Sequence, residues 1–529
     1  MVLLIAAGWK LIFLVWDKFP FNSDEAIVAL MARHILGGAK PLFFYGQSYM
    51  GSLDAWFVAA GFFVFGQHVW VIRVVQTLLY LGVVTTTIWI TYLITGSKKS
   101  AIVSGIFLTI PTINVTLYTT VSLGGYNEAL FIGNILIILA IEIRRKFQQG
   151  VKKSRWLWLV LLWGLFSGLG LWANALTLTY VMPSSIYLIW IWIKYRDKHT
   201  EKIRPVPTLI VILVGFLVGS MPFWVHGFQN GWDSLFKELL GSAIAIESGG
   251  FVQRAIYHIR NFILLGIPVV LGIRPPWEIR WLALPLIPFL LIAWGWLLWG
   301  VSKKNQIEPD YTAEKRLLSG IGTTLVLAFL FTSFGIDPSG RYFIPLYMIA
   351  AISIGLIFEK ANKTNFSICV CIILVYNLAT TFQCAIKDPP AITTQFYAPS
   401  IVDHSYDQEL IEFLTQEGEY YGYTNYWVSY PLAFQTAEEL IYTPRLPYHT
   451  NLSYTERDDR YTLYQQLVSQ SERPAYITTG QTELETYLRV SFDSLGVTWK
   501  EESIGDYHVF YHLSRTVHPS DIGLGVNRN

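Results

Sequence analysis

Long apolar runs separated by short polar segments dominate the first 386 residues. Because a helix that crosses a bilayer needs about 20 apolar residues, each run of about that length predicts a membrane span. The run 156–193 has 38 uncharged residues and is too long for one crossing, so it predicts two helices with a turn near Asn174 or somewhat later, before Pro183. The pattern therefore predicts about eleven transmembrane helices. They come from residues 1–16, 74–97, 100–119, 126–143, 156–193, 205–226, 281–301, 317–335, 341–358 and 365–386.

The positions of Lys and Arg between these runs set the expected orientation. Cytoplasmic loops of membrane proteins carry an excess of both residues. With eleven spans and a cytoplasmic N-terminus, five basic clusters fall on the inner side, provided that the shorter runs 53–66 and 255–273 do not cross. We expect these two runs to be interfacial or re-entrant segments of large outer loops, at 17–70 and 227–280. The clusters are Lys98-Lys99, 144–155, 194–204, Lys303-Lys304, and Lys360 with Lys363.

Residues 387–529 differ from the rest in both charge and pattern. They hold 9 Lys and Arg against 20 Asp and Glu, whereas residues 1–386 hold 30 against 17. Helical spacing alternates with short strand-like runs, which predicts a small α/β domain after the linker Pro389-Pro390. With the topology above, this domain is extracytoplasmic. The predicted helices are 406–416, 458–469 and 482–495, and the predicted strands are 420–423, 475–479, 499–503 and 508–513.

Composition supports the same fold class, an all-α polytopic membrane protein with a small α/β C-terminal domain. The chain is 53% hydrophobic and only 14% charged, against about 25% charged in an ordinary soluble chain. A soluble enzyme, a disordered chain and a nucleic-acid binder are therefore excluded. The three cysteines, Cys369, Cys371 and Cys384, lie in or beside one apolar run and offer neither a disulfide framework nor a zinc motif.

Asp24 and Glu25 form the strongest local signal, directly after the first apolar run. Asn22 or Ser23 is a good N-cap, so the two acids fall in the first turn of a helix that ends near Ile35. The positive end of the helix dipole favours an ionised carboxylate there. Such a group can take a proton from a hydroxyl or amine nucleophile. Acidic residues also occur at helix starts merely as partners of the dipole.

Glu128 is a second acidic candidate, in the sequence Gly124-Gly125-Tyr126-Asn127-Glu128 at the start of a predicted span. A carboxyl group beside an apolar stretch is expected to face a cavity rather than lipid. Glu128 could orient an acceptor, bind a cation or assist Asp24. Asp54 is interpreted as a structural group. Because the sequence has no compact Asp-x-Asp or histidine cluster, we assign no metal site, and a divalent cation stays an open alternative.

Outer basic residues matter if the substrate is an anionic lipid. Arg341 with Tyr342 begins a late span, and arginine can bind a phosphate through two hydrogen bonds. Arg254, His258 and Arg260 lie in the third outer loop, with Arg254 and His258 on one helix face. We include all five among the candidate substrate-binding residues, although each could also be an ordinary interface anchor.

These features together resemble the GT-C fold glycosyltransferases of the family 39-like group, the relatives of protein O-mannosyltransferases and aminoarabinose transferase. The resemblance covers about residues 1–386 and rests on the order of short motifs. They are Asp24-Glu25 after the first span, Lys40-Pro41-Leu42, the aromatic run 51–66, Arg73, and Arg341-Tyr342-Phe343-Ile344-Pro345.

The resemblance implies a sugar donor carried on a polyprenyl phosphate and an inverting transfer in one displacement on the outer face. Asp24 matches the catalytic carboxylate, the general base toward the acceptor, and Glu25 matches its neighbour. Glu128 matches a second acidic residue by position alone, and Arg341 would lie near the lipid phosphate. The implied location is the plasma (inner) membrane. The sugar and the acceptor, which could be a glycan, a lipid or a protein, are left open.

Two other functions stay open at this point. A polymerase or ligase of polyprenyl-linked glycans would share both substrate and topology. A non-enzymatic lipid or solute transporter would instead predict charges deep within the spans and a repeat symmetry. The sequence shows no repeat of fixed period, and its charges gather at the ends of the runs. The pattern therefore favours the glycosyltransferase.

Overall fold

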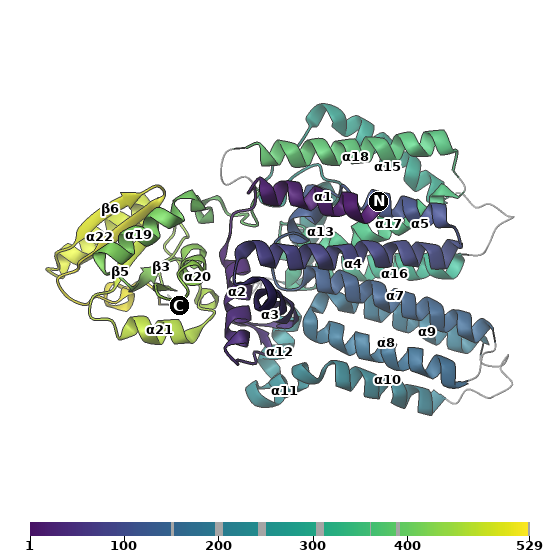
Figure 1. The fold of residues 1–529 in the computed structure, drawn as a ribbon, viewed down its shortest axis with the longest axis horizontal. Helices are drawn as coiled ribbons and strands as arrows, with labels where there is room; N and C mark the ends of the chain where they lie inside the picture. The colour runs from purple at the N-terminus through teal and green to yellow at the C-terminus, as the bar shows by residue number, and fades with distance from the viewer. Residues whose placement is uncertain are drawn as a thin grey trace. The chain divides into compact units, whose positions relative to one another are not determined.

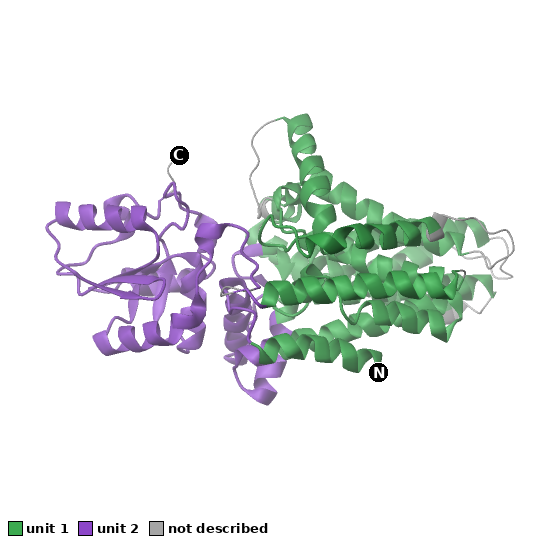
Figure 2. Cartoon of the chain, turned by 90° about the horizontal axis from the view of Figure 1, so that it is seen from above, with its two compact units in different colours: residues 1–16, 48–54, 73–385 green, residues 17–47, 55–72, 386–529 purple. Residues whose placement is uncertain are grey.

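The computed structural model describes residues 1–149, 153–195, 205–241, 250–302, 311–359, 361–387 and 392–526. The predicted basic cluster Lys303-Lys304 and linker Pro389-Pro390 lie outside these residues. The chain divides into two compact units, coloured separately in Figure 2. We call residues 1–16, 48–54 and 73–385 the membrane unit, and residues 17–47, 55–72 and 386–529 the α/β unit. Two segments of the predicted first outer loop thus group with the C-terminal segment, which the sequence pattern did not predict.

The membrane unit is helical, and each of the ten apolar runs forms at least one helix. Asn174 ends one helix and caps the next short turn, so the long run 156–193 divides where the sequence predicted. The helices are α1 (Val2–Val15), α4 (Val69–Thr95), α5 (Lys98–Phe107), α6 (Ile113–Tyr118), α7 (Tyr126–Gln148), α8 (Lys153–Ala173), α9 (Leu178–Tyr195), α10 (Pro205–Gly219), α11 (Met221–Asn230), α12 (Trp232–Leu239), α13 (Phe251–Asn261), α14 (Ile267–Val270), α15 (Ile287–Ser302), α16 (Thr312–Phe331), α17 (Ile344–Phe358) and α18 (Lys363–Ala385).

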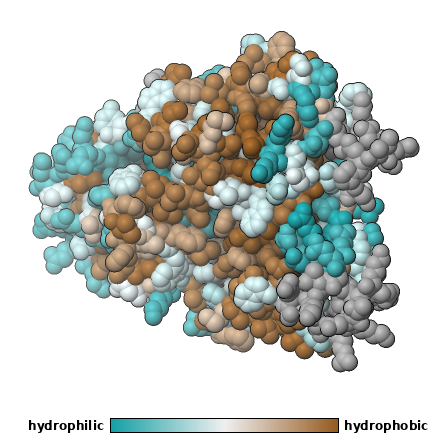
Figure 3. Space-filling view, turned by 45° about the vertical axis from the view of Figure 1, so that its right-hand side comes forward, coloured by the Kyte–Doolittle hydropathy of each residue, from teal (hydrophilic) through white to brown (hydrophobic). Residues whose placement is uncertain are grey.

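Six of the described helices are long and apolar enough to cross a membrane, which makes the chain a multi-pass membrane protein. The count becomes seven if α10 and α11, bent by 64° at their junction, form one span. The predicted count of eleven is not confirmed, because several apolar runs form helices that are shorter or broken. Hydrophobic residues cover a broad part of the face seen in Figure 3, and large apolar side chains such as Leu213, Ile292 and Val375 are exposed.

Small residues allow α8 and α10 to approach closely. Gly164 and Gly168 on α8 face Gly215 and Gly219 on α10, and a Cβ atom at any of the four would collide with a carbonyl oxygen of the facing helix. Two glycines four residues apart are a common device for close packing of membrane helices, where apolar burial alone does not drive association. In Figure 1 these helices run alongside α7 and α9. The buried core there includes Leu136, Trp163 and Tyr180.

The α/β unit contains a five-stranded sheet in the order β4-β3-β5-β7-β6. Strands β4, β3 and β5 are parallel, whereas β7 pairs antiparallel with both β5 and β6. The strands are β3 (Tyr421–Thr424), β4 (Ile441–Pro444), β5 (Ala475–Thr479), β6 (Lys500–Ile504) and β7 (Tyr507–Tyr511). The helices are α2 (Ser23–Leu36), α3 (Leu53–Phe65, shared with the membrane unit at its start), α19 (Asp407–Glu417), α20 (Tyr426–Gln435), α21 (Thr462–Ser469) and α22 (Thr482–Ser494).

Most predicted elements of the C-terminal segment are present within a few residues of the expected bounds. The exceptions are α20 and β4, which the sequence did not predict. Because β4 and β5 lie on opposite sides of β3, the chain reverses direction across the sheet at β3. In open α/β sheets, ligands bind beside the carboxyl ends of the strands at such a reversal. The residues that follow β3 and β4 are therefore of special interest.

Candidate active site

Asp24 lies in the first turn of α2, as the sequence predicted. The Asn22 side chain accepts a hydrogen bond from the Glu25 backbone N–H at 3.2 Å and so caps the helix. The cap fixes the start of α2 and places Asp24 one residue inside it. The Asp24 side chain is partly exposed. It is thus held at a defined helix start and keeps access to solvent.

Tyr426 is the hydrogen-bond donor to Asp24. Its hydroxyl donates to Asp24 Oδ1 at 2.6 Å, across 402 positions of sequence. Tyr426 begins α20 directly after β3, where the Asn425 side chain accepts from the Trp427 backbone N–H at 2.9 Å. The Ser23 hydroxyl also donates to the Tyr426 carbonyl oxygen. The starts of α2 and α20 are therefore joined by two hydrogen bonds within the α/β unit.

Arg460 adds a positive charge to the same cluster from the segment that follows β4. Its guanidinium lies 5.5 Å from the centre of the Tyr426 ring, and its backbone N–H donates to the Tyr430 hydroxyl at 2.6 Å. When the Gln47 amide is turned so that its oxygen faces the guanidinium, it accepts from both terminal nitrogens at 2.7 and 2.8 Å. Gly46 lies so close that a Cβ there would be 2.9 Å from Arg460 Cδ.

The electrostatics of this cluster keep its donors protonated. Burial, followed by the Asp24 carboxylate, raises the pKa of Tyr426 well above its ordinary value, so its hydroxyl remains a donor. Burial lowers the pKa of Arg460, but Tyr426, Asp24 and Asp458 raise it overall, so the guanidinium remains charged. Burial raises the pKa of Asp458 to about 7, with Asp24 adding to the rise and Arg460 opposing it. Asp24 thus has a neutral hydrogen-bond donor and a charged guanidinium in its surroundings.

Glu25 follows Asp24 in sequence but differs from it in environment. Its side chain is fully buried, whereas that of Asp24 is partly exposed. Adjacent residues of a helix point in directions about 100° apart, so one faces the interior while the other does not. The structure therefore separates the two members of the predicted pair, and Asp24 is the one with access to a substrate.

Glu128 lies in the membrane unit and contacts the carboxyl group of Asp54. Both are buried, with 1% and 3% of their surface exposed. Asp54 accepts from Gln76 Nε2 at 2.6 Å and from the Ser122 hydroxyl at 2.5 Å. Asn127 then donates to Gln76 Oε1 at 2.7 Å, which extends the network. The interpretation of Asp54 as a hydrogen-bonded structural group agrees with this geometry.

Lys10 ends a related network in the same unit. Its ammonium group is fully buried and donates to the Thr119 carbonyl, the Thr119 hydroxyl and the Thr120 hydroxyl at 2.8, 2.7 and 2.9 Å. The Thr119 carbonyl also accepts from Asn127, so hydrogen bonds connect Lys10 with Asp54 through the interior. Lys10 is the one charged residue in the sequence of the apolar run 1–16.

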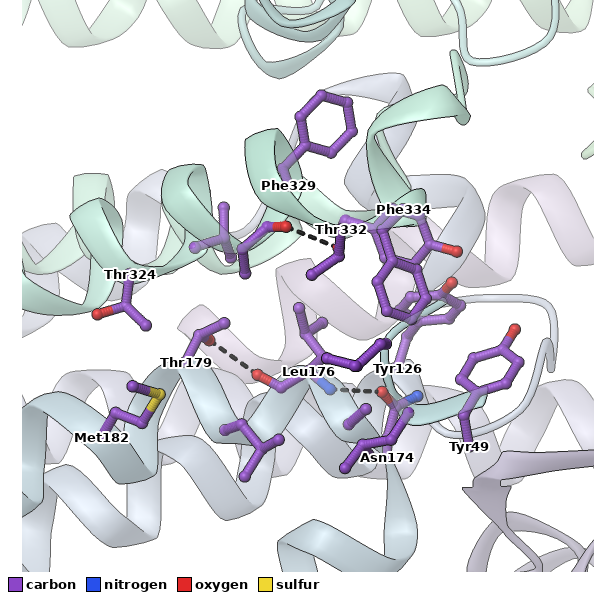
Figure 4. Close-up of a pocket in the computed structure, with 17 residues that line it drawn as sticks. Tyr49, Tyr126, Asn174, Leu176, Thr179, Met182, Thr324, Phe329, Thr332 and Phe334 are labelled. Carbon is purple, nitrogen blue, oxygen red and sulfur yellow. Dashed lines mark hydrogen bonds between the residues drawn. The ribbon is translucent and has the colours of Figure 1, made fainter. Parts of the chain in front are cut away.

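A mostly apolar cavity of about 240 Å³ lies between the helices of the membrane unit. Tyr49, Tyr126 and Phe334 gather at one end of the view in Figure 4, and Met182 and Thr324 lie at the other. An apolar space with aromatic residues at one end suits part of a hydrocarbon chain. The remaining lining residues are Asn174, Ala175, Leu176, Leu178, Thr179, Leu239, Leu240, Leu325, Ala328, Phe329, Thr332 and Tyr342.

Arg341 lies beside the aromatic part of this cavity. Its guanidinium is 5.2 Å from the centre of the ring of Tyr342, a lining residue, and it interacts electrostatically with Tyr126. An ion pair of 2.6 Å with Asp337 fixes its orientation. Its Nε has no hydrogen-bond partner among the described residues, and neither has the Tyr342 hydroxyl. The structure thus brings Arg341 and Tyr342 together where an anionic head group of a bound chain could be held.

The other three candidates lie on α13 and do not form one cluster. His258 is 2% exposed, and its Nδ1 hydrogen-bonds the Leu330 carbonyl at 2.9 Å, so it packs against α16. Arg260 is exposed and lies over the ring of Tyr257 at 4.7 Å. Arg254 is partly buried one turn before His258. Their predicted role in substrate binding stays a prediction.

Metal ligands do not gather in the described part of the chain. No group of three or more His, Cys, Asp and Glu side chains there has the arrangement that could hold an ion. The residue types that sequence reasoning missed are Tyr426, Arg460 and Asp458. The available signal for Tyr426 was its position just after the predicted strand 420–423, where α/β domains place functional side chains. Asp458 and Arg460 lie at the start of the predicted helix 458–469 and had no such signal, because β4 was not predicted.

Comparisons with solved structures identify the fold. The chain superposes on the crystal structure of ArnT from Cupriavidus metallidurans bound to undecaprenyl phosphate with a TM-score of 0.60 and 11% identity, covering 96% of this chain and 97% of that one. An oligosaccharyltransferase from Archaeoglobus fulgidus gives a TM-score of 0.48 and 10% identity, covering 96% and 72%. The likeness to ArnT shows that the chain has the GT-C fold, as the resemblance in sequence implied.

Sequence comparisons add nothing to this result. No protein-family profile matches the chain, and no curated protein matches it. At 11% identity the likeness is one of fold and does not by itself transfer an activity.

Proposed function

We propose that this protein is an integral-membrane glycosyltransferase that moves a sugar from a polyprenyl-phosphate donor to an acceptor on the outer face of the membrane. The observation that carries the proposal is Asp24 itself, which is fixed at a helix start by the Tyr426 hydroxyl at 2.6 Å and is still partly exposed. The near-full-length likeness in fold to a protein bound to undecaprenyl phosphate supports it. The apolar cavity with Arg341 beside its aromatic part supports a lipid phosphate as ligand. Asp24, in the α/β unit, is the basic group that the resemblance in sequence implies.

The proposed chemistry is one displacement at the anomeric carbon. Asp24 takes the proton from the acceptor hydroxyl or amine, whose electron pair forms the new bond to the sugar. The bond between the sugar and the phosphate oxygen breaks, and the polyprenyl phosphate leaves with that electron pair. Attack from the side opposite the leaving group inverts the anomeric configuration.

Arg341 has the role of holding the phosphate in this scheme. A guanidinium is always charged and matches phosphate oxygens in geometry. The charge on the leaving phosphate grows as the bond breaks, so a fixed cation beside it stabilises the transition state. The ion pair with Asp337 orients Arg341 before the substrate binds. The apolar cavity would take the adjoining part of the prenyl chain.

The test uses membrane vesicles that contain the full-length protein and undecaprenyl phosphate carrying a radiolabelled hexose or pentose, tried sugar by sugar. Transfer of label and release of undecaprenyl phosphate are measured together. We expect Asp24→Asn to lower turnover at least about 100-fold, since a general base contributes roughly 10²–10⁴-fold. Glu439→Gln, a carboxylate on the loop before β4, is the matched control and should transfer sugar normally.

Two results would count against the proposal. Wild-type protein that transfers none of the sugars would remove the donor class. If folded Asp24→Asn kept its turnover, Asp24 would not be the base. The proposal of a membrane glycosyltransferase that uses a polyprenyl-phosphate donor would then remain, with another residue as base.

A further inference from the structure

Asp24 belongs to the first loop of the chain, but the side chains around it come from the C-terminal segment. Tyr426 follows β3 and donates to Asp24 at 2.6 Å, and Arg460 follows β4 and attracts both Asp24 and Asp458. All of these residues belong to one compact unit. The environment of the proposed base is therefore built by segments about 400 positions apart.

Tyr426 and Arg460 lie beyond the carboxyl ends of parallel strands, where α/β domains bind ligands. Strands β3 and β4 are parallel, so the segments that follow them emerge at the same edge. Tyr426 stands two residues after the last residue of β3, and Arg460 lies on the segment between β4 and α21. Carboxyl ends of parallel strands at a reversal of strand order form the usual binding crevice.

The side chains around Asp24 are also fixed by contacts of their own, which a positioning role requires. Tyr430 links the Asp458 carbonyl, by donation at 2.8 Å, with the Arg460 backbone N–H. With its amide turned so that the oxygen faces the guanidinium, Gln47 accepts from the two terminal nitrogens of Arg460, and Gly46 leaves the space that the Arg460 side chain needs. A side chain fixed in this way holds its charge at one place with little freedom to move.

We propose that Tyr426 and Arg460 of the C-terminal segment are positioning residues that hold the Asp24 carboxyl group in the orientation needed for proton abstraction. This inference rests on the proposed function, since it concerns the same base. Tyr426 fixes one carboxylate oxygen by its hydroxyl, which leaves the other for the acceptor. The Arg460 guanidinium lies 5.5 Å from the centre of the Tyr426 ring and so helps to fix the place of the donor.

Other titratable groups face Asp24 and enter the interpretation of any pH profile. Asp458 interacts with Asp24 and Arg460, and Tyr448 interacts with Asp24 and Asp458. Glu25 adjoins Asp24 on α2 and points into the interior. Each variant must therefore change only Tyr426 or only Arg460, so that Asp458, Tyr448 and Glu25 act on Asp24 as they do in the wild type.

The experiment measures kcat and KM against pH for the donor that wild-type vesicles use. Tyr426→Phe removes the hydroxyl and keeps the ring. We expect the acidic limb of kcat/KM to move up by about one pH unit, since one hydrogen bond to the ionised form is lost, with kcat reduced and the donor KM unchanged. Tyr442→Phe is the control, because its buried hydroxyl donates to the Glu419 carbonyl at 2.7 Å. The acidic limb of the kcat/KM profile of Tyr442→Phe should match that of the wild type.

Arg460 is tested in the same assay by two variants. Arg460→Met should move the acidic limb in the same direction as Tyr426→Phe, whereas Arg460→Lys, which keeps the charge, should restore most of the wild-type profile. Arg445→Met is the control, because Arg445 binds Asp459 at 3.0 Å.

The outcomes separate this inference from the proposed function. If Asp24→Asn is inactive but both Tyr426→Phe and Arg460→Met keep the wild-type limb and kcat, the positioning role is overturned and the proposed base survives. If Asp24→Asn stays active, the proposed base fails and the positioning role falls with it. If Tyr426→Phe does not fold, the two Arg460 variants decide alone.

Discussion

Asp24 and Asp54 both lie in the first turn of an α-helix, and in sequence they look alike. In the α/β unit, Asp24 is partly exposed and receives one hydrogen bond, from Tyr426. Asp54 in the membrane unit is 3% exposed, receives short hydrogen bonds from Gln76 and Ser122, and contacts a second carboxyl group. The first has an oxygen free for chemistry and the second has none.

The comparison shows that a buried hydrogen-bond network serves stability, whereas a partly exposed cluster can serve catalysis. A buried polar group is costly unless all of its hydrogen bonds are made, so the network from Lys10 to Asp54 fixes the arrangement of the membrane unit. An active base needs the opposite, a group that is oriented but still reachable. We therefore expect changes around Asp54 to affect stability, and changes around Asp24 to affect turnover.

Gln76→Leu should have the largest effect on stability. The side chain is 2% exposed and joins Asp54 to Asn127, so leucine leaves a buried carboxylate without its donor at similar volume. We expect a loss of about 2–4 kcal/mol, seen as a fall in the unfolding temperature of the purified protein in detergent. Thr85→Val on the exposed face of the same helix should stay within about 0.5 kcal/mol. Equal effects of both variants would contradict a structural network.

Asp458→Asn should change how stability depends on pH. The folded pKa of Asp458 is about 7, above the 3.8 of a free side chain, so the folded state binds the proton more tightly. This contribution is present in full below pH 4 and is lost as the pH rises toward 7. We expect the unfolding temperature of the wild type to fall relative to that of the variant between pH 5 and 8, by an equivalent of about 2 kcal/mol. A constant difference across this range would contradict the burial of the acid.

Ala328→Trp should cause the smallest free-energy change of the three substitutions. It fills part of the cavity in the membrane unit, so undecaprenyl phosphate should bind at least about tenfold more weakly, which corresponds to about 1.4 kcal/mol. The measurement is the rise in unfolding temperature that added undecaprenyl phosphate produces. Ile368→Trp, at a shallow apolar recess on α18, is the matched control and should bind as the wild type does. Unchanged binding by Ala328→Trp would exclude the cavity as the lipid site.

Two elements show why part of the α/β unit escaped prediction. Helix α20 has the sequence Tyr-Trp-Val-Ser-Tyr-Pro-Leu-Ala-Phe-Gln, with Pro431 inside it and nearly every residue buried, so no polar face marks its period. Strand β4 has four residues, all buried, and ends in Pro444. Each is stabilised by its neighbours in the unit, since short segments of this composition have weak preferences of their own.

The sequence by itself determined the apolar helices, the break at Asn174, most of the C-terminal strands and the helix start at Asp24. These features depend on composition and spacing within a few turns, which local physical rules describe. Tertiary structure alone decided that residues 17–47 join the C-terminal segment, that Glu25 turns inward while Asp24 does not, and that Tyr426 and Arg460 come to Asp24 from 402 and 436 positions away. The reason is that contacts between distant segments depend on how whole surfaces pack and which buried polar groups find partners, and no local pattern carries that information.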